Sequence, residues 1–194
     1  EGVGLRQRVV DETLGNQIVT FSLGLDRQPT ALITDAITGV EVEQDIASLA
    51  GFRGQAVDLT AFTMPDGTIN LALTDTEQSL WLFKGAPNVA GTFDWSLVNL
   101  TELIDAPAIA GDLTTYQPSW GSVHIAGLDA RGHAINYWFF PDATGWRFDD
   151  LTAQFDGPTM TGGLTGYVAS WDGLNLAGLN EDGEVIVYWW APPL

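Results

Sequence analysis

The sequence has 194 residues and a formal net charge of −18 at pH 7, because 25 acidic residues outnumber seven Lys and Arg. Nucleic acids and anionic membrane surfaces are bound by basic patches, so this balance argues against both as partners. The chain has no Cys, which excludes disulfides and thiolate-bound metals. No segment approaches the ~18 consecutive apolar residues of a membrane-spanning helix, so we expect no membrane insertion.

A pattern of apolar runs separated by Gly-containing turns recurs along the chain, at a period typical of repeat proteins. Ile18, Ile69, Val123 and Leu174 occupy matching positions, 51, 54 and 51 residues apart. The chain therefore divides into four copies, at about 5–51, 56–110, 111–162 and 163–194.

Each copy is expected to contain consecutive β-strands joined by tight turns. Turns such as Asp172-Gly173 between apolar runs are a strong hairpin signal, because Gly adopts positive φ without steric cost. For the first copy we predict strands at Leu5–Val10, Gln17–Leu25, Thr30–Thr34 and Val40–Ile46. For the second we predict Val57–Thr63, Thr68–Thr74, Ser79–Phe83 and Phe93–Leu100. For the third we predict Leu113–Trp120, Val123–Asp129, His133–Phe139 and Gly145–Thr152. The fourth has only Leu164–Trp171, Leu174–Asn180 and Glu184–Trp190.

Many short, evenly spaced strands with periodic Gly and aromatic residues are typical of a β-propeller. We predict an all-β fold: a single propeller domain over residues 1–194 with four blades of ~50 residues, or part of a larger propeller. The fourth blade lacks its outer strand. Little helix is expected, since Asp45–Gly51 favours a turn and Pro107 interrupts Thr101–Ala110. The chain begins with Glu1 rather than Met, which is consistent with a piece of a longer precursor.

The apolar run Glu184–Trp190 predicts a strand covered on both faces, as packing between blades would provide. By the same argument, four tryptophans are most simply packing between blades. They are Trp95, Trp138, Trp146 and Trp189.

Four phrases of the repeat resemble the blades of lectin-type propellers, the fungal fucose-binding lectins and their tectonin-like and bacterial relatives. They are Ser170-Trp171, Leu174–Asn180, Tyr188-Trp189 and Gly145-Trp146. The resemblance implies a propeller that holds a sugar between adjacent blades, through an Arg of the second strand, a Glu of the third and a stacking aromatic ring.

Carried over by position, the Arg of that family falls near His124, Asn175, Asn70 and Val19. The Glu falls near Asn136 and Val187. No copy keeps the Arg–Glu pair, so the resemblance implies the scaffold and a neutral, amide-rich site around His124, Asn136 and Trp146. Trp120 and Trp171, at matching ends of two inner strands, are candidates for stacking on a sugar, with core packing as the alternative. The candidate ligand-binding residues are therefore His124, Asn136, Trp146, Trp120, Trp171 and Asn175.

Catalytic and metal-binding motifs are not found. A glycosidase needs two carboxylates across a cleft, and nothing in the sequence fixes such a pair among Asp149, Asp150, Glu102 and Asp105. Asp150 and Asn99 share a repeat position, which indicates a structural turn role. The turn carboxylates are typical of backbone capping. We expect no catalytic residue, no cofactor and no metal site. Calcium binding stays open without a specific motif, as does a metal pair of His124 and His133 with Asp129.

The sequence thus predicts a non-enzymatic binding module, secreted or at the cell surface, that recognises a glycan or surface polymer at clefts between blades. The alternative is a structural propeller that docks onto other protein subunits of an envelope or surface assembly. A homo-oligomer or a larger parent chain would then complete the fourth blade, whose open edge favours strand pairing.

Overall fold

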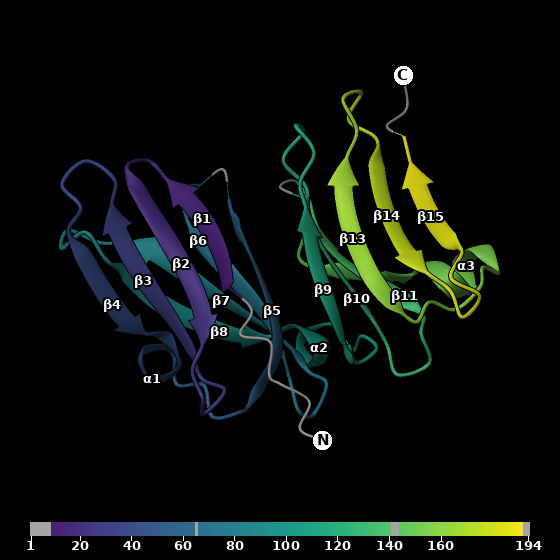
Figure 1. Ribbon diagram of the computed structural model, residues 1–194, viewed down its shortest axis with the longest axis horizontal. Coiled ribbons are helices and arrows are strands. Elements are labelled where there is room, and N and C mark those ends of the chain that lie inside the picture. Colours follow the sequence, from purple (N-terminus) through teal and green to yellow (C-terminus); the bar gives the residue numbers. More distant parts are fainter. Residues whose placement is uncertain (1–8, 65, 141–143, 192–194) are drawn as a thin grey trace. The chain divides into compact units, whose positions relative to one another are not determined.

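The computed structural model describes residues 9–64, 66–140 and 144–191 (Figure 1). Over these ranges the chain forms fifteen β-strands and three helices of four or five residues, which confirms the all-β prediction. No helix within them has the length and apolar character needed to cross a membrane.

The strands form four antiparallel sheets, each built from strands that are consecutive in sequence. We call these sheets blades 1 to 4. Blade 1 contains β1 (Val9–Leu14), β2 (Gln17–Leu23), β3 (Pro29–Asp35) and β4 (Glu41–Asp45). Blade 2 contains β5 (Ala56–Thr63), β6 (Ile69–Asp75), β7 (Leu80–Pro87) and β8 (Phe93–Asn99). Blade 3 contains β9 (Gly111–Tyr116), β10 (Val123–Leu128), β11 (Ala134–Phe139) and β12 (Arg147–Asp150). Blade 4 contains β13 (Gly162–Val168), β14 (Leu174–Leu179) and β15 (Val185–Trp190).

The first strand of blade 1 is displaced from its prediction. We expected Leu5–Val10, whereas β1 spans Val9–Leu14, and residues 5–8 lie outside the described ranges. Gly15 adopts a φ of 60° and forms, with Asn16, the two-residue turn that pairs Leu14 with Gln17. Because such a turn sets the register of its hairpin, the strand continues up to it.

The hairpin turns contain residues with positive φ, as expected, but in one turn that residue is not the glycine. Gly132 and Gly183 adopt φ values of 82° and 75°. At the Asp172-Gly173 turn, however, Asp172 is the residue with positive φ, at 62°. Gly173 is required there for another reason: a Cβ at this position would overlap the Trp171 ring.

The outer strands of blades 1 to 3 end earlier than predicted, because each leads into a short helix. These are α1 (Ile46–Ala50), α2 (Leu100–Leu103) and α3 (Leu151–Phe155). Each begins after an N-cap at the same repeat position: Asp45, Asn99 or Asp150, whose side chain accepts a hydrogen bond from the backbone N–H three residues on. The structural turn role of Asp150 and Asn99 is therefore helix capping.

The described chain divides into two compact units, 1–76 with 82–98, and 77–81 with 99–194. The second unit holds blades 3 and 4, where β9 and β13 lie side by side. Gly166 of β13 packs directly on the ring of Tyr116 in β9, and its N–H donates to Thr114 Oγ1 at 3.0 Å. A shared core joins the two blades, and includes Leu128, Met160 and Leu176. Whether both units form one domain stays a prediction.

The last strand differs from its prediction. The apolar run at β15 was expected to be covered on both faces, yet Val185 and Trp189 are each 66% exposed. β15 pairs with β14 on one side, and no strand of the described chain pairs with its other side. Val185, Val187 and Trp189 alternate with Ile186 and Tyr188, which pack against the core shared with blade 3, so the exposed side chains lie on the face of β15 turned away from that blade.

Candidate functional site

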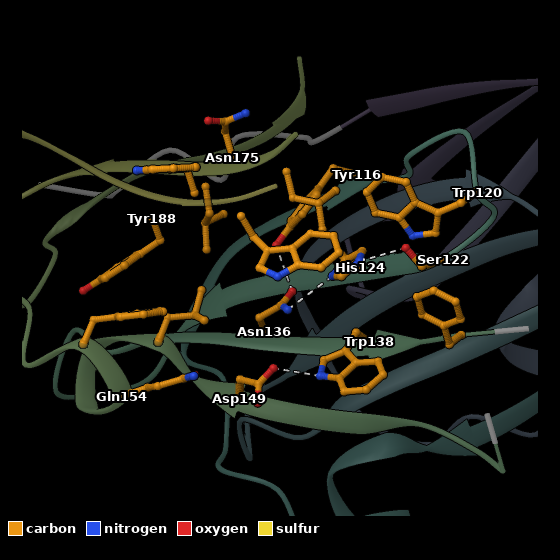
Figure 2. A pocket seen from close by; sticks show the side chains of 17 residues that line it. Tyr116, Trp120, Ser122, His124, Asn136, Trp138, Asp149, Gln154, Asn175 and Tyr188 are labelled. Atoms are coloured by element: carbon orange, nitrogen blue, oxygen red, sulfur yellow. Dashed lines mark hydrogen bonds between the residues drawn. The ribbon is translucent and has the colours of Figure 1, made fainter. Parts of the chain in front are cut away.

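A cleft of about 360 Å³ lies between blades 3 and 4, and all its lining residues belong to the second unit (Figure 2). Eight of the seventeen lining side chains are aromatic, contributed by both blades. Blade 3 provides one wall from its four strands and α3, and blade 4 provides the other from β14 and β15. Concave, mostly apolar sites with a few polar groups are the usual form of small-ligand sites.

The polar floor of the cleft is a chain of four hydrogen-bonded side chains, three on β9, β10 and β11 and the fourth that of Ser122, just before β10. Tyr116 donates its hydroxyl proton to Asn136 Oδ1 at 3.0 Å. The amide nitrogen of Asn136 lies 3.3 Å from Nδ1 of His124, and Nε2 of His124 lies 3.0 Å from Ser122 Oγ. With this amide orientation Nδ1 accepts, so the ring proton is on Nε2 and is donated to Ser122.

Burial keeps this floor uncharged. His124 is 8% exposed and stacks on Tyr116 with ring centroids 4.9 Å apart. Desolvation lowers the pKa of His124 to about 4, against a smaller opposing effect of its bond with Asn136. Burial raises the pKa of Tyr116, and the negative charge of Asp149 raises it further. Both rings are therefore neutral at physiological pH, and the charge of Asp149 is felt at the floor.

Asp149 places a carboxylate at the cleft. It lies on β12, opposite Asn136 in the sheet register. Its Oδ2 accepts from Trp138 Nε1 at 2.8 Å, and its Oδ1 has no hydrogen-bond partner among the described residues. The guanidinium of Arg147 lies over the Trp138 ring, 5.5 Å from its centroid, but Arg147 does not line the cleft. Figure 2 shows Asp149 and Trp138 beneath the His124–Asn136 pair.

Blade 4 supplies the opposite wall. Asn175 is buried, and its amide nitrogen donates to the Gly173 carbonyl at 3.0 Å. Tyr188 donates its hydroxyl to Thr152 Oγ1 at 3.2 Å, which joins β15 to α3. Trp190 packs edge-on against Trp120, with ring centroids 5.5 Å apart. These contacts hold the walls without closing the space between them.

Of the six predicted ligand-binding residues, the structure brings four to this cleft: His124, Asn136, Trp120 and Asn175. Trp146 and Trp171 do not line it. Trp146 packs against Phe139, with ring centroids 5.7 Å apart, and Trp171 covers Gly173 while remaining 54% exposed. Whether any of the six binds a ligand stays a prediction.

Thirteen of the seventeen lining residues were not among the candidates, and three of these had been given other roles. Trp138 and Trp189 were assigned to packing between blades, and Asp149 was considered only as half of a carboxylate pair. The available signal was register: Asn136 predicts a cross-strand neighbour on β12, and Trp138 lies two residues from Asn136 on the same face of β11. That reasoning would have selected Asp149 and Trp138 over Trp146.

The other histidine belongs to a separate cluster at the hairpin end of blade 3. His133 Nδ1 lies 2.8 Å from Asp150 Oδ2, and Arg131 binds Asp129 Oδ2 through Nε and Nη2 at 2.9 and 2.8 Å. The two histidines thus have different partners, which gives no support to a shared metal. Among the residues that the structure describes, no group of three or more His, Cys, Asp or Glu could hold a metal ion.

Comparison with known proteins gives matches of structure. No protein-family model matches the chain, and no curated protein matches its sequence. The SapL1 lectin, solved with α-methyl fucoside, is 12% identical with a TM-score of 0.61 over 95% of this chain and 60% of the lectin. The six-bladed Aleuria aurantia lectin is 12% identical with a TM-score of 0.57 over 96% of this chain and 59% of the lectin.

An enzyme gives a match of similar quality. The intramolecular trans-sialidase from Ruminococcus gnavus is 14% identical with a TM-score of 0.58, over 92% of this chain and 42% of the enzyme. The chain spans about 60% of the length of the two lectins and less of the enzyme. At such low identities the likeness is one of fold: the chain is built from β-propeller blades of the kind found in fucose-binding lectins.

Proposed function

We propose that the chain is a non-enzymatic carbohydrate-binding module, secreted or at the cell surface, which holds a saccharide in the cleft between blades 3 and 4. One observation carries the proposal: aromatic side chains from two blades face each other across a cleft with a neutral polar floor. The apolar C–H face of a sugar ring packs on such rings, while its hydroxyl groups need polar partners at the edges. The lectin-like fold supports this reading.

The lining favours binding over hydrolysis. Two carboxylates about 5–10 Å apart are needed for most glycoside hydrolysis. Asp149 is the only carboxylate among the seventeen lining residues, all of which the structure describes. His124 has both ring nitrogens engaged and a pKa of about 4, so it is poorly suited to act as a general base near pH 7.

Two exposed tryptophans of blade 4 provide a matched test. Trp190 lines the cleft on the face of β15 that meets Trp120 and is 49% exposed, whereas Trp171 is 54% exposed and lies outside it. On a glycan array followed by calorimetry, we expect Trp190→Ala to weaken saccharide binding about tenfold and Trp171→Ala to change it less than about twofold. Aryl glycosides should not be hydrolysed. Equal effects of the two substitutions, or silence of the unmodified protein across a broad array, would reject the proposal.

A second candidate is docking of a protein strand on blade 4. β15 is an edge strand in the described chain, and its exposed residues are apolar: Val185, Val187, Trp189 and Trp190. Such an edge pairs readily with an added strand from another subunit. Sedimentation velocity over a range of concentrations tests this. We expect self-association that Val187→Lys, on the exposed strand, weakens. A monomer at every concentration would count against it.

A further inference from the structure

The cleft is lined by a single charged side chain, and its charge is negative. Asp149 is the only Asp, Glu, Lys or Arg among the lining residues, all of them described. The remaining polar side chains are Ser, His, Asn, Gln and Tyr, and His124 is buried and neutral. An anionic ligand would therefore meet a carboxylate without a lining cation to offset it, whereas a cationic ligand would meet an opposite charge.

The polar floor offers little to a ligand, because its members already bind one another. Tyr116, Asn136, His124 and Ser122 use their facing donors and acceptors within their own chain of hydrogen bonds. Oδ1 of Asp149 remains an acceptor without a partner in the described chain. It requires a hydrogen-bond donor, and an ammonium group is a donor with no acceptor.

The aromatic walls add a preference of the same sign. A cation near the face of a Trp or Tyr ring is attracted by the ring quadrupole, more strongly where water is excluded. Trp138 already holds Arg147 in this way from outside the lining, so a ligand cation would compete with Arg147 for this ring. Arg147 is exposed, so its opposing effect on a ligand in the cleft is screened by solvent.

We infer that the cleft selects saccharides that carry a protonated amine over neutral ones, and disfavours those that carry a carboxylate, through the carboxylate of Asp149 set among aromatic walls. The inference rests on the proposed carbohydrate binding. The cleft, at about 360 Å³, has room for a sugar ring as well as its ammonium group.

The test compares three trisaccharides of similar size by calorimetry at about pH 6, where sugar amines are largely protonated: a glucosamine trimer, an N-acetylglucosamine trimer and a galacturonic acid trimer. We expect the glucosamine trimer to bind at least about tenfold more tightly than the N-acetylated one, with a ratio that falls as salt is added, and the acidic trimer to bind most weakly. Equal affinities for the first two would overturn the inference.

Two substitutions on β12 with opposite charge effects make the test specific. Asp149→Asn keeps an oxygen acceptor for Trp138 but removes the negative charge. The glucosamine and N-acetylglucosamine trimers should then bind with about equal affinity. Arg147→Gln removes the cation over Trp138 and should increase the preference, by about twofold to threefold. Thermal melting confirms that each variant folds. A preference that both variants leave unchanged would overturn the inference.

The remaining outcomes separate the two proposals. If no saccharide binds, neutral or charged, the proposed function fails and the inference fails with it. If saccharides bind without a preference for the amine, only the inference fails. If tetramethylammonium competes as well as the glucosamine trimer, the site recognises a cation without the sugar, which also overturns the inference.

Discussion

Blades 1 and 2 contact each other through the same repeat positions as blades 3 and 4, but side chains fill the space in the first pair and leave a cleft in the second. In the first pair, Trp95 from the outer strand of blade 2 packs edge-on against Phe21, with ring centroids 6.0 Å apart. Its Nε1 donates to Gln44 Oε1 at 3.1 Å. Gln44 also binds both backbone polar groups of Phe93. The space between these blades is occupied by protein side chains.

In the second pair, Asp149 takes the place of Gln44. Gln44 on β4 lies opposite Ala31 on β3. Asp149 on β12 lies opposite Asn136 on β11, which is the corresponding position of the register in blade 3. Blade 4 has no fourth strand in the described chain, so no equivalent of Trp95 reaches Asp149. Trp138 of the same blade binds it instead, and a cleft lies alongside. One repeat position thus supports packing in one pair and a candidate binding site in the other.

The comparison is tested most severely by removing one tryptophan from each contact. Trp95→Ala removes the ring that fills the space between blades 1 and 2, along with its hydrogen bond, and should destabilise the protein by about 3 kcal/mol. Trp190→Ala, at a 49% exposed position of the cleft, should cost less, about 1 kcal/mol. Urea unfolding followed by circular dichroism measures both. Similar costs would mean that the two contacts are packed alike.

The pH dependence of stability distinguishes blade 3, which has His124 at the floor of its cleft, from blades 2 and 4, which have Asn at the matching position. The pKa of His124 is about 4 in the folded chain, below the ordinary value of 6.5, so the unfolded chain binds more protons between these values. Stability is unaffected above about 6.5, falls as the pH falls through this window, and is lower by up to about 3 kcal/mol below 4.

His124→Asn introduces the residue found at the matching positions 70 and 175, and should remove this contribution. Other titrating groups are common to both proteins, so the difference between their unfolding free energies across pH 4 to 7 isolates His124. A difference that stays constant with pH would show that His124 is not buried and neutral as its contacts indicate.

Much of the architecture follows from local signals. Positive-φ glycines such as Gly132 and Gly183 end their hairpins where the sequence pattern predicts, because few other residues adopt that backbone at so little cost. Repeat spacing then placed fifteen strands in four sheets. Where the prediction erred, a competing local feature decided: Asp150 capped α3 and ended β12, and the Gly15-Asn16 turn moved β1.

The cleft was only half predictable, for a reason that concerns long-range packing. His124 and Asn136 lie on neighbouring strands of one hairpin, so repeat alignment was enough to bring them together. Alternation with Asn136 puts Trp138 rather than Trp146 on the same face, but it does not say whether a cleft stays open above it. That depends on how α3 and β15 pack, through contacts such as Tyr188 to Thr152, which no local pattern encodes.

The smallest expected effect concerns Trp120, whose buried Nε1 has no hydrogen-bond partner in the described part of the chain. Trp120→Phe keeps an aromatic ring for the edge-on contact with Trp190 and removes a donor whose burial is uncompensated. The unfolding free energy should therefore change by less than about 0.5 kcal/mol. Trp138→Phe is the matched control, because its Nε1 bonds Asp149, and it should cost about 1 kcal/mol. A larger loss for Trp120→Phe than for Trp138→Phe would place the stabilising indole contact of the cleft at Trp120, in the turn after β9, rather than at Asp149, and would move the polar centre of the candidate site accordingly.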